Sequence, residues 1–363
     1  MCYSLYADSS TSDHKNVPPC PLNECFARGD AALTNGCPSG YNTPAQVHLV
    51  DRNYQGFFTL SYLYWNAQQE GMDVARSATL AGSFATPSGE TLFHDFDYNS
   101  GFKIGLGVDF EECDNWAFRV DYTRLHQNNT TTYTASGATD ALYLTNWFYQ
   151  TNGVSQNPAA TSVQSTWDFD LDWLDATMSR PFYQGKKFTV SPFGGLRASW
   201  ISQTFDVEIA DVLNFGGTAL DTSTSHNKLT SWAIGPRVGM EGRFLMGAGF
   251  RLQGNVGASL LFTKYDRVSH SENGIVPTNP TVSYFMDDYT CLRPMLEANL
   301  GLGWGMYVFN NNAHIDLSAT YDFNYLWGQN MMGTLNEINI LGNSNNGFDL
   351  SLQGLTVSAQ FHF

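Results

Sequence analysis

The chain ends on Thr356-Val357-Ser358-Ala359-Gln360-Phe361-His362-Phe363, where apolar and polar side chains alternate and the last residue is aromatic. Successive side chains of a β-strand point to opposite faces, so the four apolar residues share one face and the four polar residues share the other. A strand that alternates in this way and ends in an aromatic residue is typical of an outer-membrane β-barrel. A half-buried terminal strand of a soluble sandwich would show the same short pattern.

Composition favours the membrane interpretation. Of the 363 residues only 14 % are charged and 14 % are aromatic, whereas a soluble protein usually has about a quarter charged residues. The mean hydropathy is −0.26 and no run of 18 apolar residues occurs, so the sequence predicts no helical membrane span. With 18 Lys and Arg against 34 Asp and Glu, the net charge of −16 disfavours nucleic acid as a partner.

Residues 1–50 differ from the rest, because they are rich in Pro, Gly and Asn and hold four of the six cysteines. We expect a small periplasmic extension held by disulfides and followed by a barrel over residues 51–363. The candidate disulfide cysteines are Cys2, Cys20, Cys25 and Cys37. Zinc binding is the alternative, but their spacing lacks the close pairs of zinc modules. The first residues also lack the basic start and apolar core of a signal peptide, so we expect the sequence to begin near a mature N-terminus.

From about residue 55 onward the apolar side chains recur at every second position. Phe102 to Phe110 and Trp116 to Tyr122 form two such runs around a short turn. Another run, Trp167 to Trp173, alternates apolar residues with three aspartates. Its alternation becomes irregular over residues 174–178, which suggests a β-bulge.

The whole pattern predicts ten strands joined alternately by short and long connections. The short turns are expected near 111–115, 183–187, 244–248 and 309–313. The long connections are expected near 79–95, 127–165, 208–227, 265–288 and 328–347. Short periplasmic turns and long external loops characterise outer-membrane barrels, so the sequence predicts an all-β, antiparallel transmembrane barrel of about ten strands. Two further strands, one of them at Met72–Thr79, would raise the count to twelve.

Five short segments resemble the Legionella major outer membrane protein family, which includes porin-like proteins of chlamydia-related bacteria. They are Phe57-Phe58 through Leu63-Tyr64-Trp65, Pro192-Phe193-Gly194-Gly195-Leu196-Arg197, Ile234-Gly235-Pro236-Arg237-Val238-Gly239, Tyr321-Asp322-Phe323-Asn324-Tyr325 and Leu352-Gln353-Gly354-Leu355. They occur in consistent order, and the resemblance covers roughly residues 55–363. It implies a pore-forming barrel in the bacterial outer membrane and says nothing about the cysteine-rich extension.

Charged residues occur on the faces of these strands that we expect to line the lumen. The candidates are Arg119, Asp121, Arg197, Arg237, Glu241, Arg251, Arg293 and Glu297. We expect Glu241 to pair with Arg251 across the turn near 244–248. Such residues would form either a constriction that selects solutes by charge and size or a salt-bridged plug. Ten strands enclose only a narrow cylinder, so both interpretations stay open.

The sequence thus predicts a porin for passive diffusion of small hydrophilic solutes or ions, with a mild preference for cations from the acidic excess. It sits in outer-membrane lipid, and a homo-oligomer is possible. One alternative is a structural envelope protein that is cross-linked by disulfides and has a largely filled lumen. A less favoured alternative is an omptin-like surface protease using acidic residues near Asp95, Asp168 and Asp287. We expect no enzymatic activity, no cofactor and no metal.

Overall fold

The computed structural model describes residues 54–81, 84–110, 116–137, 139–145, 147–148, 159–184, 187–210, 222–273, 281–309, 312–341 and 347–363. The four candidate disulfide cysteines and the predicted extension lie outside these residues. Among the cysteines that the structure describes, Cys291 is a free thiol. No helix within the described ranges is long and apolar enough to cross a membrane.

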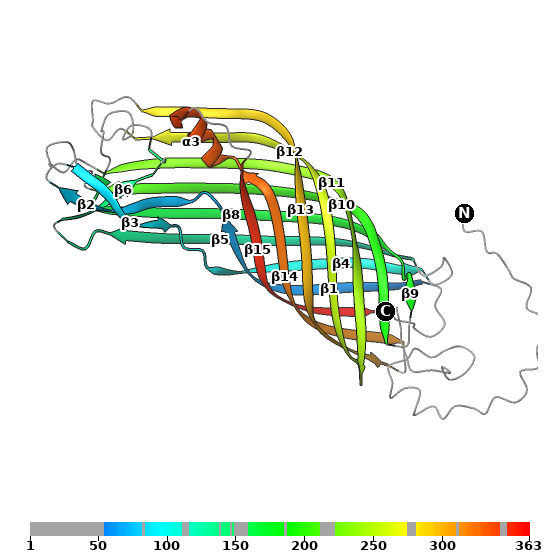
Figure 1. The fold of residues 1–363 in the computed structure, drawn as a ribbon. Coiled ribbons are helices and arrows are strands. Elements are labelled where there is room, and N and C mark those ends of the chain that lie inside the picture. The colour runs from blue at the N-terminus through cyan, green and yellow to red at the C-terminus, as the bar shows by residue number, and fades with distance from the viewer. Residues whose placement is uncertain are drawn as a thin grey trace, which may run out of the picture.

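The main sheet is a closed antiparallel barrel of ten strands, as the sequence predicts (Figure 1). In chain order the strands are β1 (Tyr54–Gln69), β4 (Tyr98–Phe110), β5 (Trp116–Thr134), β8 (Ser162–Ser179), β10 (Phe188–Ala210), β11 (Ser223–Gly247), β12 (Phe250–Glu272), β13 (Val282–Val308), β14 (Ala313–Asn330) and β15 (Phe348–His362). Each strand pairs with the next, and β15 pairs with β1, as in Leu60↔Ala359, to close the cylinder.

Short turns and longer connections gather at opposite ends, here called the short-turn end and the long-loop end. The chain turns from β11 into β12 through Ala248 and Gly249, whose φ angles of 53° and 81° suit the tight type I′ hairpin. The C-terminus and the two-residue strand β9 (Tyr183–Gln184) both lie at the short-turn end, whereas β2, β3, β6 and α3 lie at the other end (Figure 1).

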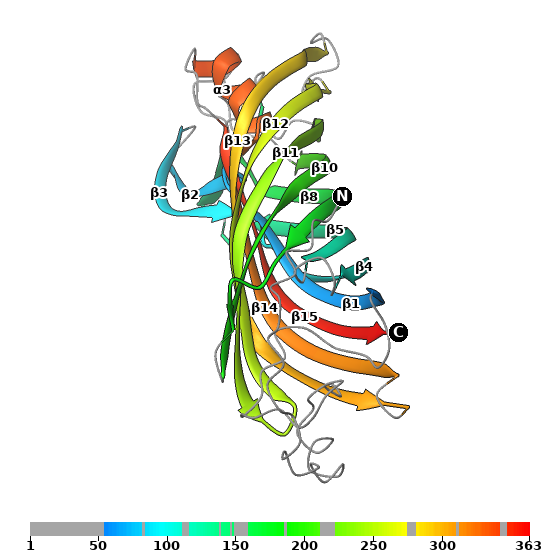
Figure 2. The ribbon, with the colours of Figure 1, turned by 90° about the vertical axis from the view of Figure 1, so that its right-hand side faces the viewer.

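The long-loop end carries a second, small sheet and a helix. The sheet has the order β3-β2-β6-β7, with β2 at Asp73–Ala81, β3 at Phe84–Phe93, β6 at Asp140–Leu144 and β7 at Ala159–Ala160. The segment Met72–Thr79 is therefore mostly strand, but it belongs to this sheet and adds nothing to the barrel. Figure 2 shows the small sheet projecting beside the barrel wall.

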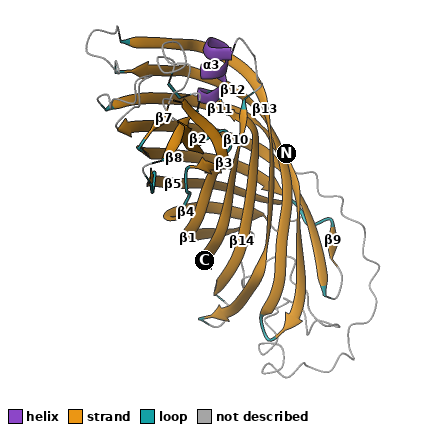
Figure 3. Ribbon diagram, turned by 60° about the vertical axis from the view of Figure 1, so that its left-hand side comes forward, coloured by secondary structure: helices purple, strands orange, loops and turns teal. Residues whose placement is uncertain are grey.

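Helix α3 (Met332–Leu341) joins β14 to β15 and contacts β12 and β11 (Figure 3). The side chain of Asn330 accepts a hydrogen bond from the backbone N–H of Met332 at 2.9 Å. It thereby satisfies one of the donors that the first turn of a helix leaves free.

Several strands are much longer than a membrane requires. A transmembrane strand needs about 9–11 residues, whereas β11 has 25 and β13 has 27. The predicted long connection at 265–288 is wrong in extent, because β12 continues to Glu272 and β13 begins at Val282. The polar residues there belong to strands that continue past the apolar band of the barrel.

The strands reverse their polarity along their length. Near the short-turn end apolar side chains point outward, with Phe102 at 39 %, Phe118 at 41 % and Leu300 at 61 % exposed. Toward the long-loop end of β8 the apolar residues point inward instead, and Trp167, Phe169, Leu171 and Trp173 are buried. β8 pairs with both neighbours without a register shift. The bulge suggested for residues 174–178 is therefore wrong, and the irregular pattern marks where the outer surface changes from apolar to polar.

Candidate functional site

The lumen near the short-turn end holds a polar cavity of about 210 Å³, here called the vestibule. Its wall combines serine and threonine hydroxyls with amides and charged side chains. The charged residues are Lys103, Arg119, Asp121, Arg237, Glu241, Arg243, Arg251, Asp316 and Asp322. Five of them are basic and four are acidic, so the excess of acid in the whole chain is not reproduced on this wall.

Most charges of the vestibule are paired with a near neighbour. Arg119 donates from Nε to Asp121 at 2.6 Å, and Arg243 donates from Nε to Glu241 at 2.6 Å. In each case the two residues are two positions apart on one strand, on the same face. The predicted pair of Glu241 with Arg251 is not formed, because Arg251 instead contacts Asp316 of β14 at 2.5 Å.

Lys103 is different, since no carboxylate of the described residues lies within ion-pair distance of its ammonium group. Its register neighbours are Ser61 on β1 and Thr123 on β5. Ser61 in turn shares a hydrogen bond of 2.8 Å with Ser358 across β1 and β15. An ammonium group with free donors beside a wall of hydroxyls is suited to attract a hydrated anion.

On the side of the vestibule toward the long-loop end, four charged side chains form an ion-pair layer: Asp175, Arg197, Arg237 and Glu297. Arg197 contacts Asp175 at 2.6 Å and Glu297 at 2.8 Å. Arg237 also binds Glu297, with one contact at 2.9 Å, and donates to Thr177 at 2.9 Å. The layer has two positive and two negative groups, so its formal charge is zero.

Aromatic rings border the same layer. The guanidinium of Arg197 lies 4.8 Å from the ring centre of Trp173, and that of Arg237 lies 4.7 Å from the ring centre of Phe193. Both distances fall within the range of cation–π attraction. Ion pairs within the layer and cation–π contacts with the bordering rings therefore hold its side chains in place.

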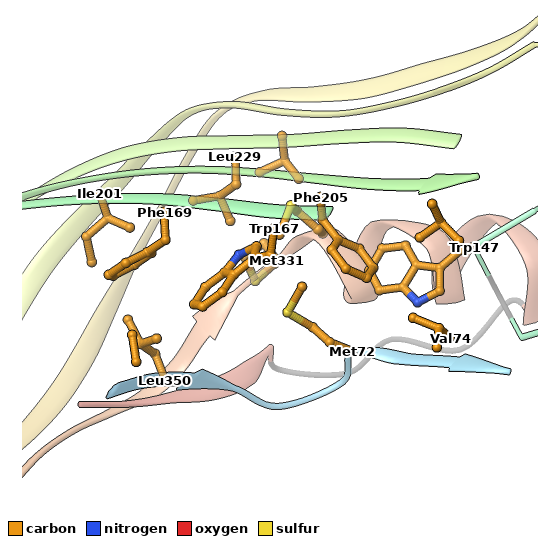
Figure 4. Close-up of a cluster of buried hydrophobic side chains, with 14 of the residues drawn as sticks. Met72, Val74, Trp147, Trp167, Phe169, Ile201, Phe205, Leu229, Met331 and Leu350 are labelled. Atoms are coloured by element: carbon orange, nitrogen blue, oxygen red, sulfur yellow. The ribbon is translucent and has the colours of Figure 1, made fainter. Parts of the chain in front are cut away.

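The lumen toward the long-loop end is filled by apolar side chains, here called the stopper (Figure 4). The barrel wall contributes rings and aliphatic groups such as Trp167, Phe169, Phe205 and Leu229. Segments outside the barrel strands contribute the rest. These are Met72, Val74, Ala75, Leu142, Leu144, Trp147, Phe148, Ala160, Met331, Met332 and Leu335. Figure 4 shows Met72 and Met331 beside Trp167, between opposite walls of the lumen.

His94 is buried against the stopper between β3 and β4. Its Nδ1 lies 2.8 Å from the hydroxyl of Ser165, and its ring packs edge-on against Phe96, Trp167 and Phe205. Burial lowers the pKa of His94 from 6.5 to about 4, because the charged imidazolium would lose its hydration there. At neutral pH the ring is therefore uncharged and compatible with its apolar surroundings.

The structure places the predicted lumen residues in three zones. Arg119, Asp121, Arg237, Glu241 and Arg251 line the vestibule. Arg197 and Glu297 lie in the ion-pair layer, which Arg237 joins. Arg293 lies closer to the long-loop end, where it contacts Tyr265 and the sulfur of Met331 at the edge of the stopper.

Sequence reasoning missed five charged residues of the site, namely Lys103, Asp175, Arg243, Asp316 and Asp322. Lys103 and Asp322 lie on the inward faces of clearly alternating strands, so that alternation alone could have identified them. Asp175 lies in the segment where the alternation looked irregular. Arg243 and Asp316 lie next to predicted turns, where the boundaries of the strands were uncertain.

Over residues 51–363 the chain matches the protein family described as Legionella pneumophila major outer membrane protein precursor. No curated protein has a sequence similar enough to match. Among solved structures, the outer membrane protease OmpT of Escherichia coli is similar at 11 % identity and a TM-score of 0.39, covering 88 % of this chain and 99 % of its own. A major outer membrane protein from Thermus thermophilus is similar at 8 % identity and a TM-score of 0.29, covering 86 % and 100 %.

OprG from Pseudomonas aeruginosa is similar at 12 % identity and a TM-score of 0.27, covering 69 % of this chain and 95 % of its own. The family match spans the whole barrel, including every charged residue of the vestibule and of the ion-pair layer. The protein is a bacterial outer-membrane β-barrel, and the chain belongs to the Legionella pneumophila major outer membrane protein family.

Proposed function

We propose that the protein is a porin through which small hydrophilic solutes or ions diffuse, and that the described conformation is its closed state. The vestibule carries this proposal. It is a polar cavity inside a barrel whose outer face at the same level is apolar. A barrel with a purely structural role would not require a charged cavity large enough for solvent in its lumen.

The origin of the stopper side chains supports a lumen that closes reversibly rather than one that is permanently filled. Part of it comes from segments that are not barrel strands, including Met72 before β2 and Met332 and Leu335 in α3. These segments can move away without breaking the hydrogen bonds that close the cylinder. Hydrophobic constrictions gate channels by excluding water, so their displacement would let the vestibule connect with the long-loop end.

Planar-bilayer recording tests this proposal. We expect the wild-type protein to show rare or small current steps, and a Met72→Ser, Met332→Ser variant to open at least several-fold more often. The matched control is Met178→Ser, a methionine on the outward, exposed face of β8, which should behave as wild type. Silence of both wild type and stopper variant, in correctly folded protein, would overturn the proposal.

A structural envelope protein is the second candidate, and the stopper also favours it, because apolar side chains from most of the strands meet across the lumen. Covalent cross-linking would require the candidate cysteines Cys2, Cys20, Cys25 and Cys37 to join different chains. Non-reducing electrophoresis of envelopes would show ladders that collapse on reduction. A single band under both conditions would count against it.

We propose no enzymatic activity. The omptin-like alternative needs acidic residues that converge with a histidine at the rim of the lumen. In the described part of the chain, His270 is instead buried and bonded to Asn227 and Glu272. Asp168 and Asp170 lie on the outer surface of the wall, and Asp287 is exposed. Incubation with peptide substrates, with and without Asp168→Asn, should show no cleavage by either protein.

A further inference from the structure

The outer surface of the wall carries a group of metal-ligating side chains outside the lumen. His126 on β5 lies opposite Asp170 on β8, and Asn128 lies opposite Asp168 in the same pair of strands. One ring nitrogen of His126 and one carboxylate oxygen from each aspartate all lie within 4.8 Å of one another. Their backbones are fixed by the register of two hydrogen-bonded strands.

We propose that His126, Asp168 and Asp170 bind a divalent transition metal ion such as Zn²⁺. Imidazole nitrogen and carboxylate oxygen bind zinc tetrahedrally at about 2.0–2.2 Å, so the ligand atoms around one ion are about 3.4 Å apart. Side-chain rotations that move each ligand atom by about 1 Å bring the three groups to that spacing. Water completes the coordination in this arrangement, as it does at three-ligand zinc sites.

Charge and access both favour a cation here. Arg124 lies 3.2 Å from Asp172 on the same face of β8 and 3.8 Å from Asp170, so one guanidinium faces three aspartates and leaves an excess of negative charge. The side chains of His126 and Asp170 are 54 % and 38 % exposed, which lets an ion reach them without any opening of the barrel. The amide of Asn128 donates to Asp168 at 2.9 Å and orients that carboxylate, as partners of metal ligands commonly do.

A second histidine on the outer surface provides an internal comparison. His226 on β11 lies 2.5 Å from Asp206 on β10, in the same cross-strand arrangement. Within the described residues, no third ligand group converges with this pair closely enough to hold an ion. The two sites differ in the number of ligands they can offer, so only the site at His126 should retain a metal.

Titration of the purified full-length protein with Zn²⁺ tests the proposal. The protein carries no histidine tag, its thiols are alkylated, and binding is measured by calorimetry in detergent. We expect one saturable equivalent in the wild type that is weakened at least about tenfold by His126→Ala or by Asp168→Asn. Co²⁺ in place of zinc should give absorption bands in the wild type that the same two variants lose.

The matched control is His226→Ala, which should bind like wild type. All three substituted side chains are on the outer surface, and unchanged β-sheet circular dichroism confirms that the variants fold. Equal binding by the wild type and both ligand variants would overturn the proposal, as would the absence of a saturable equivalent. An equal loss in His226→Ala would also overturn it, because binding would then not need three converging ligands.

Discussion

Arg197 donates two hydrogen bonds to Asp175 across β10 and β8, from Nε at 2.6 Å and from Nη2 at 2.7 Å. Both side chains are only 3 % exposed. Removing one partner of a buried pair leaves the other charge without compensation, which typically costs about 3–5 kcal/mol. We therefore expect Asp175→Asn to lower the free energy of unfolding by an amount of this order, measured by denaturant unfolding in detergent.

Asp172 offers the control for this experiment, because it lies on the same strand, β8, and pairs with the exposed Arg124 of β5 at 3.2 Å. An exposed ion pair contributes about 0–1 kcal/mol, so Asp172→Asn should change stability little. Equal effects of the two substitutions would contradict the special role of the buried layer.

Because the polarity of the two faces reverses along β8, we expect neighbouring residues of this strand to tolerate opposite kinds of substitution. Leu171 points inward and is fully buried, whereas Asp170 points outward. We expect Leu171→Asp to prevent or severely weaken folding, because it places a carboxylate without a partner in the stopper. Asp170→Leu should fold normally. Thermal unfolding of both variants, compared with wild type, distinguishes this arrangement from one in which Leu171 faces lipid.

Near the short-turn end we expect the opposite result, because there the outward-facing residues are apolar and the inward-facing residues are polar. Leu300 on β13 is exposed on the apolar outer face. Replacing it by arginine should cost about 2–4 kcal/mol, the range for a cation deep in hydrocarbon. Gln253, which lines the vestibule, should accept arginine with little effect on stability. Refolding yields into lipid vesicles measure the difference, and equal yields would contradict the assigned faces.

Lys103 should set the charge preference of any current. Its ammonium group lies beyond ion-pair distance of every carboxylate of the described residues, and the vestibule wall carries five basic against four acidic groups. Lys103→Glu should therefore shift the reversal potential in a KCl gradient toward cations. The control is Lys264→Glu, on the outer surface beside Asp288. A shift of equal size in the control would show that the vestibule does not select ions.

Acid should loosen the stopper through His94. Its pKa is lowered by burial to about 4 in the folded protein, against 6.5 when the ring is hydrated. Opened chains therefore bind more protons, and stability is lost as the pH falls from about 6.5 toward 4. Limited proteolysis between pH 7 and 4.5 should show increasing cleavage in wild type and a flatter profile in His94→Gln.

The barrel could be predicted from sequence because lipid on one side and solvent on the other impose a period of two. That signal locates the ten strands and five of the vestibule's charged residues. It fails from Trp167 to Trp173, where a period of two also appears but the apolar face points inward. Alternation reports that the two faces differ, and it does not report which of them meets lipid.

The partners of the ion-pair layer could not be predicted for a related reason. Glu297 on β13 binds Arg197 on β10 and Arg237 on β11, so the contacts cross the lumen between strands that are not neighbours. Sequence spacing predicts only pairs across adjacent strands. How deeply the loops fill a narrow cylinder depends on side-chain volume in three dimensions, and no period in the sequence records it.

The polarity reversal has a consequence for biogenesis. Near the short-turn end, the apolar side chains of each long strand contact the bilayer. Toward the long-loop end, its apolar side chains are buried only against the other strands of the barrel. Insertion can therefore stabilise the first end one hairpin at a time, but the second end gains its apolar contacts only once the cylinder is complete. Bilayer thickness should accordingly govern the assembly of one end and leave the maturation of the other unaffected.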